Sequence, residues 1–369
     1  MKKAVVSVTN DLATDQRVQR SIAVLREQGY AVTFVGRLLP GSLPFDPPYR
    51  TKRFRLPFRR GWAFYTSYNL RLFFFLLAHS YDLYWSNDLD TLLPNFLVAR
   101  LRRKTLIYDS HEYFTGAPEL QDRPLVRGIW KTLESWIFPR LSRVITVNES
   151  IAELYRQDYG KKPLVIRNIA TGEVPPPLSR RELGLPEEAF LLINQGSGIN
   201  RDRGMEELLE ALALLPARFQ LVLVGGGDVL ELLRKRAAQQ GLEHRLHYFR
   251  ARPYREMLRI TRVCDCGLSL DKDTNINYRY SLPNKLFDYF KCGLPVVGSP
   301  VVEVSSLVKR YAAGEVTPVA ASSIAEAILH LEKQGVSSYR EGLRQAARDH
   351  TGEGEMARLS AFLKPIVER

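Results

Sequence analysis

Short apolar stretches alternate with amphipathic segments along the first half of the chain. The first such unit has an apolar stretch at residues 4–8, a helical pattern from about 15–28 that stops at Gly29, and a second apolar stretch at 31–35. This order predicts a strand, a helix and a second, parallel strand. The same alternation predicts further strands at residues 82–85, 105–108, 143–147 and 164–166.

The alternation resumes after a proline-rich stretch at residues 173–178. Strands separated by helix-length segments are typical of doubly wound parallel sheets, so both halves read as α/β. We predict a Rossmann-like domain at residues 1–172, a second one at 173–350, and a final helix at 351–369 that packs back on the first domain. The second domain has predicted strands at residues 190–194, 219–224, 245–249, 264–270 and 295–297.

The length of the chain agrees with two domains, and its net charge suggests an anionic partner. The 369 residues exceed the roughly 100 to 200 that one domain usually takes. The chain has 53 Lys and Arg against 40 Asp and Glu, a net charge of +13. Nucleic acid, a phosphorylated substrate and a membrane surface would each suit this excess.

The cysteines and the apolar runs indicate the compartment. Cys264, Cys266 and Cys292 cannot form a disulfide framework and lack the paired spacing of a zinc site. We therefore expect a reducing, cytoplasmic setting. The amino terminus lacks the apolar region of a signal peptide, and the longest apolar run, residues 72–78, is far below the roughly 18 to 20 residues that cross a bilayer.

Residues 280–297 carry the most informative pattern. Ser281 or a neighbour suits the cap of a helix, and Gly293 suits its end. Such a helix points its amino end at the edge of the sheet where ligands bind, and Lys285 adds a positive charge there. Asp288, one turn later, could accept hydrogen bonds from the two vicinal hydroxyls of a ribose. The alternative is that Lys285 and Asp288 form an ordinary surface pair.

A loop rich in glycine and arginine, residues 195–204, directly follows the first predicted strand of the second half. Glycines let backbone N–H groups approach a phosphate, and Arg201 and Arg203 offer fork-shaped donors to its oxygens. The alternative is a flexible turn with solvated arginines. A second glycine run, residues 225–227, is a weak signal by itself.

His111 follows the predicted strand at 105–108 and is flanked by Asp109 and Glu112. A histidine in this place can donate a hydrogen bond to a sugar hydroxyl, and a neighbouring carboxylate can fix its tautomer. Because it lies at the carboxyl end of a strand, we favour a functional role over a structural one. Asp88 follows the preceding strand, and we expect it to line the same site.

Residues 10–17 follow the first strand, where a dinucleotide-binding enzyme would have a glycine-rich loop. The G-x-G-x-x-G spacing is missing, which counts against a nicotinamide-dependent dehydrogenase. Asp11 and Asp15 would either meet substrate hydroxyls or cap the helix that begins near Asp15.

Cations and aromatic residues gather at residues 50–65, and six cations without any acid lie between Arg50 and Arg60. Such a surface could dock on anionic lipid headgroups, with its aromatic side chains at the interface. A solvated loop over core aromatics is the alternative. Nucleic acid would suit the charge, but no nucleic-acid-binding motif accompanies it, and we expect no such partner. The predicted membrane-surface residues are Arg53, Arg55, Arg59, Arg60 and Trp62.

Three segments together resemble the retaining glycosyltransferase family 4, whose members have the GT-B fold. The sequence from Ser281 to Tyr289, followed by Cys292 to Val297, is similar to the donor-binding signature of that family. Asn10 to Val18 and Tyr108 to Glu112 resemble motifs of its amino-terminal domain. The resemblance covers nearly the whole chain, and it implies two Rossmann-like domains that face a central cleft.

The resemblance also implies roles for single residues. Asp288 matches the carboxylate that holds the nucleotide ribose, His111 matches a histidine beside the donor sugar, and Arg203 matches a lysine of the phosphate-binding loop. Tyr280 stands where many members have the first Glu of a Glu-x7-Glu pair, and we expect a different donor mode. The resulting candidates are His111, Arg203 and Lys285 for catalysis, Gly198, Arg201, Arg203, Gly226, Ser281, Asn284, Lys285 and Asp288 for the donor, and Asp11, Asp15 and Asp88 on the acceptor side.

The function implied is transfer of a sugar from a UDP-type or GDP-type nucleotide sugar to a hydroxyl of a glycan or lipid-linked acceptor, on the inner face of the cell membrane. The pairs Asp88-x-Asp90 and Asp271-x-Asp273 look like the metal-binding pairs of another glycosyltransferase fold but lack its context, so we predict no metal and no cofactor. A nucleotide-sugar epimerase of the same fold and a non-catalytic sugar-nucleotide-binding protein are the alternatives.

Overall fold

The computed structural model describes residues 1–13 and 15–367 and divides the chain into two compact units. Unit 1 contains residues 1–168 and the chain from residue 353 onward, which forms most of the last helix, and unit 2 contains residues 169–352. Thr14, within the first predicted motif, and the last two residues of the predicted final helix lie outside the described part of the chain.

Unit 1 is built on a parallel sheet of seven strands in the described residues, in the order β3-β2-β1-β4-β5-β6-β7. The direction of winding therefore reverses between β1 and β4, and ligands of such sheets bind at the carboxyl ends of the strands beside that reversal. The strands are β1 Lys3–Asp11, β2 Ala31–Arg37, β3 Arg50–Phe54, β4 Leu83–Asn87, β5 Thr105–Ser110, β6 Val144–Thr146 and β7 Leu164–Val165.

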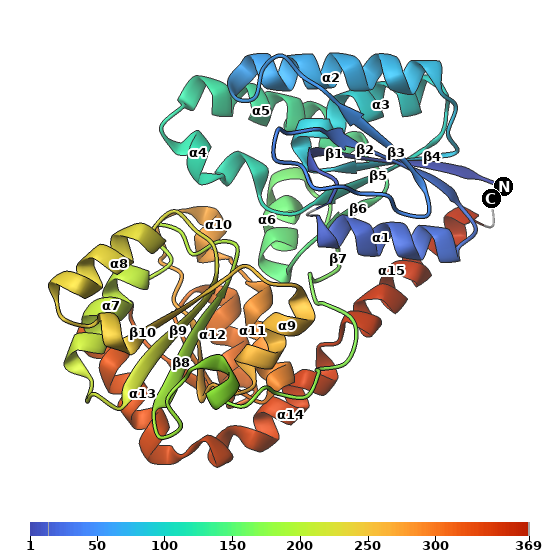
Figure 1. Cartoon of the computed structure of the whole chain (residues 1–369). Helices are drawn as coiled ribbons and strands as arrows, with labels where there is room; N and C mark the ends of the chain where they lie inside the picture. The colour runs from blue at the N-terminus through green and yellow to red at the C-terminus, as the bar shows by residue number, and fades with distance from the viewer. Residues whose placement is uncertain (14, 368–369) are drawn as a thin grey trace. The chain divides into compact units, whose positions relative to one another are not determined.

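Helices cover both faces of this sheet, with α2 and α3 along one face and α1 and α15 along the other (Figure 1). Helix α15 contributes Leu359, Leu363 and Ile366 to the core that contains Val6 of β1 and Ile22 of α1. The helices of unit 1 are α1 Gln16–Glu27, α2 Gly61–Ala78, α3 Leu92–Leu101, α4 Pro118–Gln121, α5 Pro124–Ile137, α6 Glu149–Tyr159 and α15 Gly352–Val367.

Unit 2 repeats the arrangement with a parallel sheet of six strands among its described residues, in the order β10-β9-β8-β11-β12-β13. Here the reversal falls between β8 and β11. The strands are β8 Phe190–Gly196, β9 Phe219–Gly225, β10 Leu246–Arg250, β11 Cys266–Ser269, β12 Val296–Gly298 and β13 Gly314–Val316. The helices are α7 Met205–Leu214, α8 Leu230–Gln239, α9 Tyr254–Thr261, α10 Ile276–Arg279, α11 Asn284–Cys292, α12 Val302–Arg310, α13 Ala321–Gln334 and α14 Arg340–Asp349.

The predicted α/β class is confirmed, and two strands escaped prediction. β3 is an edge strand that carries Arg50, Lys52 and Arg53, a composition that protects an exposed edge but does not read as a strand. β13 is only three residues long. The expected helix cap is also different: Pro283 precedes α11 with no side-chain cap, while Gly293 ends the helix at a φ of +75° as expected.

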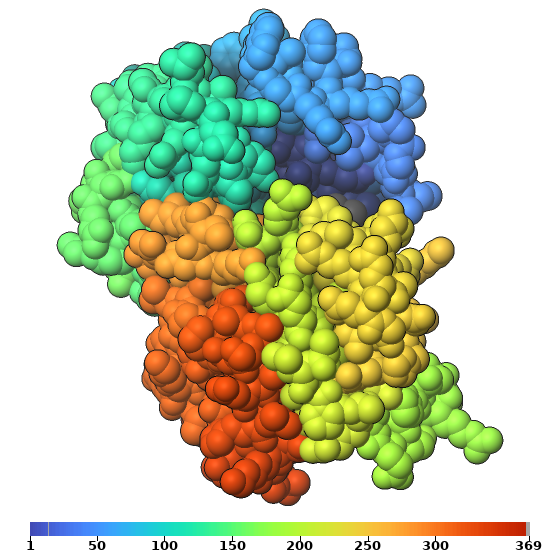
Figure 2. Space-filling model, turned by 90° about the vertical axis from the view of Figure 1, so that its left-hand side faces the viewer, coloured from blue at the N-terminus to red at the C-terminus, as the bar shows by residue number. Residues whose placement is uncertain are grey.

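Helix α5 exposes an apolar side. Leu125 is 84% exposed and Ile129 is 69% exposed, and Arg123 and Arg127 lie in the same stretch. Figure 2 shows this segment, in teal, on the surface of unit 1. Within the described residues, no helix combines the length and the apolar character that a membrane crossing requires.

Candidate active site

The strand ends beside the reversal in unit 1 bring four acidic or basic side chains to one edge. Asp11 ends β1, Asp88 follows β4, and Asp109 and His111 lie at the end of β5. Asp88 has a left-handed backbone, with φ at +57°, which is uncommon for a residue other than glycine. Its backbone N–H donates to the carbonyl of Asp109 at 2.9 Å, so the two loops are fixed to one another.

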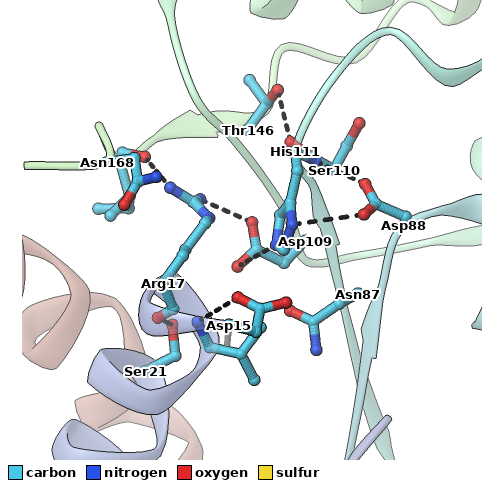
Figure 3. A network of polar contacts seen from close by, with 12 residues as sticks. Asp15, Arg17, Ser21, Asn87, Asp88, Asp109, Ser110, His111, Thr146 and Asn168 are labelled. Atoms are coloured by element: carbon cyan, nitrogen blue, oxygen red, sulfur yellow. Dashed lines mark hydrogen bonds and ion pairs between the residues drawn. The ribbon is translucent and has the colours of Figure 1, made fainter. Parts of the chain in front are cut away.

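His111 lies between two carboxylates (Figure 3). Its Nδ1 is 3.3 Å from Oδ2 of Asp88, its Nε2 is 3.7 Å from Oδ2 of Asp109, and its backbone N–H donates to Oδ1 of Asp88 at 2.8 Å. Burial alone would lower the pKa of His111, but the carboxylates of Asp88 and Asp109 raise it to about 9. The imidazole is therefore a cation near neutral pH, with N–H donors on both ring nitrogens.

Asp109 is held by a buried ion pair. Nη2 of Arg17, on α1, donates to Oδ1 of Asp109 at 2.7 Å (Figure 3). Nη1 of Arg17 donates to the carbonyl of Ile166 at 2.8 Å. Burial opposes ionisation of Asp109, yet Arg17 and His111 hold its pKa well below the ordinary range. Arg17, which the sequence did not single out, thus keeps this carboxylate charged beside His111.

Two further acids of this edge are unusual. Burial raises the pKa of Asp90 to about 7 and that of Glu112 to about 8, and the Asp88 carboxylate adds to both shifts. Asp90 also accepts a hydrogen bond from Oγ1 of Thr9. Asp88 and Asp90 therefore have different neighbours, His111 and Thr9.

The structure gives Asp11 and Asp15 local roles. Oδ1 of Asp15 accepts from the backbone N–H of Val18 at 3.1 Å, so Asp15 caps α1. Oδ1 of Asp11 accepts from the N–H of Ala13 at 3.1 Å and lies 3.5 Å from Nη2 of Arg53.

In unit 2, two glycine loops pack backbone against backbone. The N–H of Gly226 donates to the carbonyl of Gly196 at 3.1 Å, and the N–H of Ile199 donates back to the carbonyl of Gly226 at 3.0 Å. A Cβ on Gly225 would come within 2.0 Å of the Gly196 carbonyl oxygen, whereas one on Gly198 or Gly226 would meet no atom within 4 Å. The fold thus requires glycine at position 225, whereas Gly198 and Gly226 border open space.

Asp271, after β11, links the predicted donor residues. Its Oδ2 accepts from Nη1 of Arg203 at 2.6 Å and from Oγ of Ser281 at 2.7 Å. The guanidinium of Arg203 also lies 4.2 Å from the ring centre of Tyr278. Ser281 therefore orients toward Asp271 and does not cap α11. Asp271 is fully buried, and Asp273 pairs separately with Arg279.

Lys285 lies on the first turn of α11 and reaches back to the sheet. Its Nζ donates to Oδ1 of Asn194, on β8, at 3.1 Å. Burial lowers the pKa of Lys285 to about 8, while the Asp271 carboxylate opposes that shift. Arg203, Lys285 and the amino end of α11 thus place positive charge at the carboxyl ends of β8 and β11. The same turn contains Asn284, which is exposed.

Asp288 is buried and already accepts hydrogen bonds within unit 2. Oδ2 accepts from Nε2 of Gln195 at 3.0 Å, and Oδ1 accepts from the hydroxyl of Tyr254 at 2.6 Å. Gln195 in turn accepts from Thr261. A ribose at Asp288 would have to use the remaining lone pairs of its oxygens, because each carboxylate oxygen accepts more than one hydrogen bond.

One arginine departs from its expected setting, and a second is anchored only through its backbone. Arg53 does not belong to an exposed surface: its side chain is 15% exposed, and it donates to the carbonyl of Leu43 at 3.0 Å beside Asp11. Arg201 is exposed, and its backbone N–H, not its side chain, is anchored, donating to Asp228 at 3.0 Å. Arg55, Arg59, Arg60 and Trp62 are exposed as expected.

Sequence reasoning missed Arg17, Asn194 and Asp271 as members of these sites. Arg17 and Asn194 resemble ordinary polar positions of a helix and a strand. Asp271 was visible, since it lies directly after a predicted strand, but it was considered only as half of a metal pair.

Comparison with known families gives two matches. Residues 16–172 match the family described as Glycosyltransferase Family 4, and residues 177–350 match the family described as Glycosyl transferases group 1. The chain has no match among curated proteins.

Solved structures show the same fold at low identity. Sucrose-phosphate synthase from Thermosynechococcus elongatus is 19% identical over 99% of both chains, with a TM-score of 0.79. Anabaena Alr3699/HepE, solved with UDP and glucose, is 17% identical over 99% of this chain and 100% of its own, with a TM-score of 0.76. WaaG, a glycosyltransferase involved in lipopolysaccharide biosynthesis, is 14% identical over 98% of this chain and 99% of its own, with a TM-score of 0.72.

Both matched families consist of glycosyltransferases, and they account for the two α/β units in turn. The two parallel sheets match those of solved GT-B proteins over nearly the whole chain. The chain is a glycosyltransferase with the GT-B fold.

Proposed function

We propose that this protein is a retaining glycosyltransferase that takes a sugar from a UDP-type or GDP-type nucleotide sugar and attaches it to a hydroxyl of a lipid-linked or polysaccharide precursor. The observation that carries the proposal is the Arg203, Asp271 and Lys285 cluster at the amino end of α11. A nucleoside diphosphate would find two cations and the positive end of the helix dipole there. HepE, whose fold is similar, binds UDP and glucose, which supports the donor class.

The hard step is departure of the nucleoside diphosphate. The bond between the anomeric carbon and the phosphate oxygen breaks while negative charge grows on the diphosphate. Arg203 and Lys285 stabilise this charge best if they are held in place before the reaction, and Asp271 and Asn194 hold them. Retention follows if the acceptor oxygen attacks on the same face and its proton passes to the leaving phosphate. In this scheme the enzyme supplies no nucleophile, and no metal is needed to neutralise the diphosphate.

His111 serves the sugar in this proposal. As an imidazolium, it points Nδ1 at Asp88, and its Nε2–H, which makes no hydrogen bond within the described residues, donates to a sugar hydroxyl. Its two carboxylate neighbours hold the orientation of the ring. Asp288 binds the ribose in the same scheme, and Gly198 and Gly226 leave room for the backbone to approach the nucleotide.

The acceptor side faces an anionic membrane surface, and the protein is peripheral on the cytoplasmic face. Trp62 is 80% exposed at the start of α2, next to Arg59 and Arg60. Leu125 and Ile129 of α5 add apolar side chains to unit 1 that the sequence had not indicated. Exposed aromatic and apolar side chains next to cations favour an interfacial position.

A thermal-shift panel of UDP, GDP, ADP and their sugars tests the donor class, because a bound ligand raises the melting temperature by mass action. We expect a shift with UDP or GDP. No shift with any nucleotide would remove the proposal.

Measurements of turnover distinguish sugar transfer from epimerisation of the donor. Arg203→Ala should lower turnover more than donor affinity, and turnover at the wild-type rate would remove Arg203 from the leaving-group role. Incubation of the donor alone is the companion test, since formation of a new nucleotide sugar without acceptor would indicate an epimerase.

Co-sedimentation with anionic vesicles tests the membrane surface. The replacement of Arg59 and Arg60 by Gln should weaken binding, and salt should weaken it further. Vesicle binding that is unaffected by the Arg59 and Arg60 replacements and by salt would contradict the proposed membrane-binding surface.

A further inference from the structure

A cavity of about 470 Å³ opens at the carboxyl ends of β2 and β3 in unit 1. Arg37, the last residue of β2, lines one side, and Arg55 and Arg59, which follow β3, line the other. The rest of the lining is mostly apolar and consists of Leu38, Leu39, Pro40, Ser42, Leu56 and Phe58.

The cavity has cationic groups and no lining carboxylate to balance them. In the described part of the chain, no carboxylate forms a close ion pair with Arg37, Arg55 or Arg59, although the charge of Arg37 acts on the buried Asp90. Residues 47–81, which supply Arg55 and Arg59, contain no Asp or Glu. Nη1 of Arg37 donates to the carbonyl of Arg59 at 3.4 Å, and its buried Nε has no hydrogen-bond partner. A buried guanidinium N–H without an acceptor is costly, and an anion in the cavity would supply one.

The apolar part of the lining restricts the kind of anion. Leu38, Leu39 and Leu56 give a free phosphate nothing to bind, but they match the first carbons of a lipid chain. Phe58, which is 52% exposed, extends this apolar side to the surface. The lining as a whole therefore suits a phosphate or diphosphate that is attached to a lipid.

The cavity lies at the same edge of the sheet as His111. Arg37 is the cross-strand partner of Asp11, so the cavity adjoins the loop after β1. The strand order places β1 and β4 between β2 and β5, and three strand spacings amount to about 14 Å. A glycan joined through a diphosphate could thus place its phosphate beside Arg37 and extend its sugar along the edge toward His111.

We propose that this cavity binds the phosphate or diphosphate of the acceptor, and that the acceptor is a glycan linked through that group to a lipid. The inference rests on the proposed function and names its acceptor class. Arg37, Arg55 and Arg59 bind the phosphate oxygens, and the leucines contact the start of the lipid chain.

The test measures binding of geranyl diphosphate, a short lipid diphosphate, and of inorganic pyrophosphate by calorimetry, with UDP at saturation to occupy the donor site. We expect geranyl diphosphate to bind more tightly than pyrophosphate. The double variant Arg55→Gln and Arg59→Gln should lose at least tenfold in affinity for geranyl diphosphate, and unchanged affinity would overturn the inference.

A second basic cavity gives a matched control. It lies at the amino ends of β5 and β6 and is lined by Arg100, Arg103 and Arg143, among others. The double variant Arg100→Gln and Arg103→Gln removes the same charge from unit 1 and should retain affinity for geranyl diphosphate. An equal loss in both double variants would overturn the site, because it would show a general effect of net charge.

Vesicles containing anionic phospholipid distinguish a headgroup from the acceptor phosphate. If Arg55→Gln with Arg59→Gln weakens vesicle binding but leaves the geranyl diphosphate affinity intact, these arginines serve the membrane surface and the inference fails. Nucleotide affinity in the same samples keeps the two proposals apart. If the wild type binds neither UDP nor GDP, the proposed function is overturned. If it binds one of them and the Arg55→Gln and Arg59→Gln variant keeps its geranyl diphosphate affinity, only the acceptor site is overturned.

Discussion

A single carboxylate, that of Asp88, contacts His111 twice: Oδ2 lies 3.3 Å from Nδ1 of the ring, and Oδ1 accepts the backbone N–H at 2.8 Å. The double contact fixes both the ring and the backbone of the histidine. Asp88 makes both contacts from a left-handed backbone conformation. The orientation of His111 therefore depends on a residue that lies 23 positions earlier in the chain.

The ring of His111 should titrate near pH 9, since the Asp88 and Asp109 carboxylates outweigh burial. Nitrogen NMR of the imidazole measures this directly, and His111→Gln identifies the signal. Asp88→Asn should lower the midpoint by about 1 to 3 pH units, the usual effect of one close opposite charge. Asp82→Asn, which removes an exposed carboxylate paired with Lys104, should leave it in place.

The same ion pairs affect stability. The folded-state pKa of His111 is above its ordinary 6.5, so their contribution is complete below about pH 6.5 and is lost as the pH rises through about 9. An identical NMR titration midpoint of His111 in the wild type and in Asp88→Asn would show that the Asp88 carboxylate does not raise the pKa of His111.

Affinity for UDP should fall as the pH rises through about 8, because Lys285 loses its proton in that range. If the bound diphosphate needs the charged amine, the dissociation constant rises by up to about tenfold per pH unit above the midpoint. Asp271→Asn should move the midpoint lower, as it removes the carboxylate that favours the charged form. Lys285→Met should bind weakly at every pH, and a variant that kept the pH dependence would exclude Lys285 as its source.

Arg17→Met should lower the free energy of unfolding of unit 1 by about 3 to 5 kcal/mol, because it leaves Asp109 charged and buried without its partner. Tryptophan fluorescence in urea reports this unit alone, since all four tryptophans lie in it. Arg26→Met, an exposed position on the same helix, should cost less than about 1 kcal/mol. Similar losses for both variants would mean that the buried pair adds nothing of its own.

Neighbouring glycines should respond differently to alanine. A Cβ on Gly227 would lie 1.9 Å from the carbonyl oxygen of Ile199, so Gly227→Ala should displace the loop and lower the melting temperature of unit 2. Gly226→Ala meets no atom within 4 Å, and it should melt like wild type yet bind UDP more weakly by filling the space proposed for the nucleotide. Calorimetry and a UDP titration measure both effects. Wild-type UDP affinity in Gly226→Ala would place the nucleotide elsewhere.

The sequence predicted the fold well because the buried strands are apolar runs of ordinary length. β8, for example, has five consecutive buried residues, and hydrophobic runs of that kind do not depend on distant contacts. One of the two strands that were missed, β3, takes its pairing from β2 and not from its own composition. An edge strand of cations and threonine has no periodic signal, so only the neighbouring strand reveals it.

The sequence predicted the functional residues that belong to a local motif. It did not predict those whose role depends on a partner from a distant part of the chain. His111 and Lys285 belong to such motifs. Arg17 meets Asp109 from 92 positions away, and Asn194 meets Lys285 from 91 positions away. Contacts of this separation leave no trace in a single sequence. The same reason explains Arg53, whose burial beside Asp11 follows from strand order alone.

Unit 1 is assembled from both ends of the chain, and this has a consequence for synthesis on the ribosome. Its core includes Leu359, Leu363 and Ile366 of α15, whereas unit 2 is continuous from 169 to 352. Since domains fold as their residues emerge, unit 2 can complete its core first, while unit 1 must wait, with an apolar groove uncovered, until α15 has been synthesised. Chaperone contact with the nascent protein should therefore concentrate on unit 1, although most of its residues are synthesised before those of unit 2.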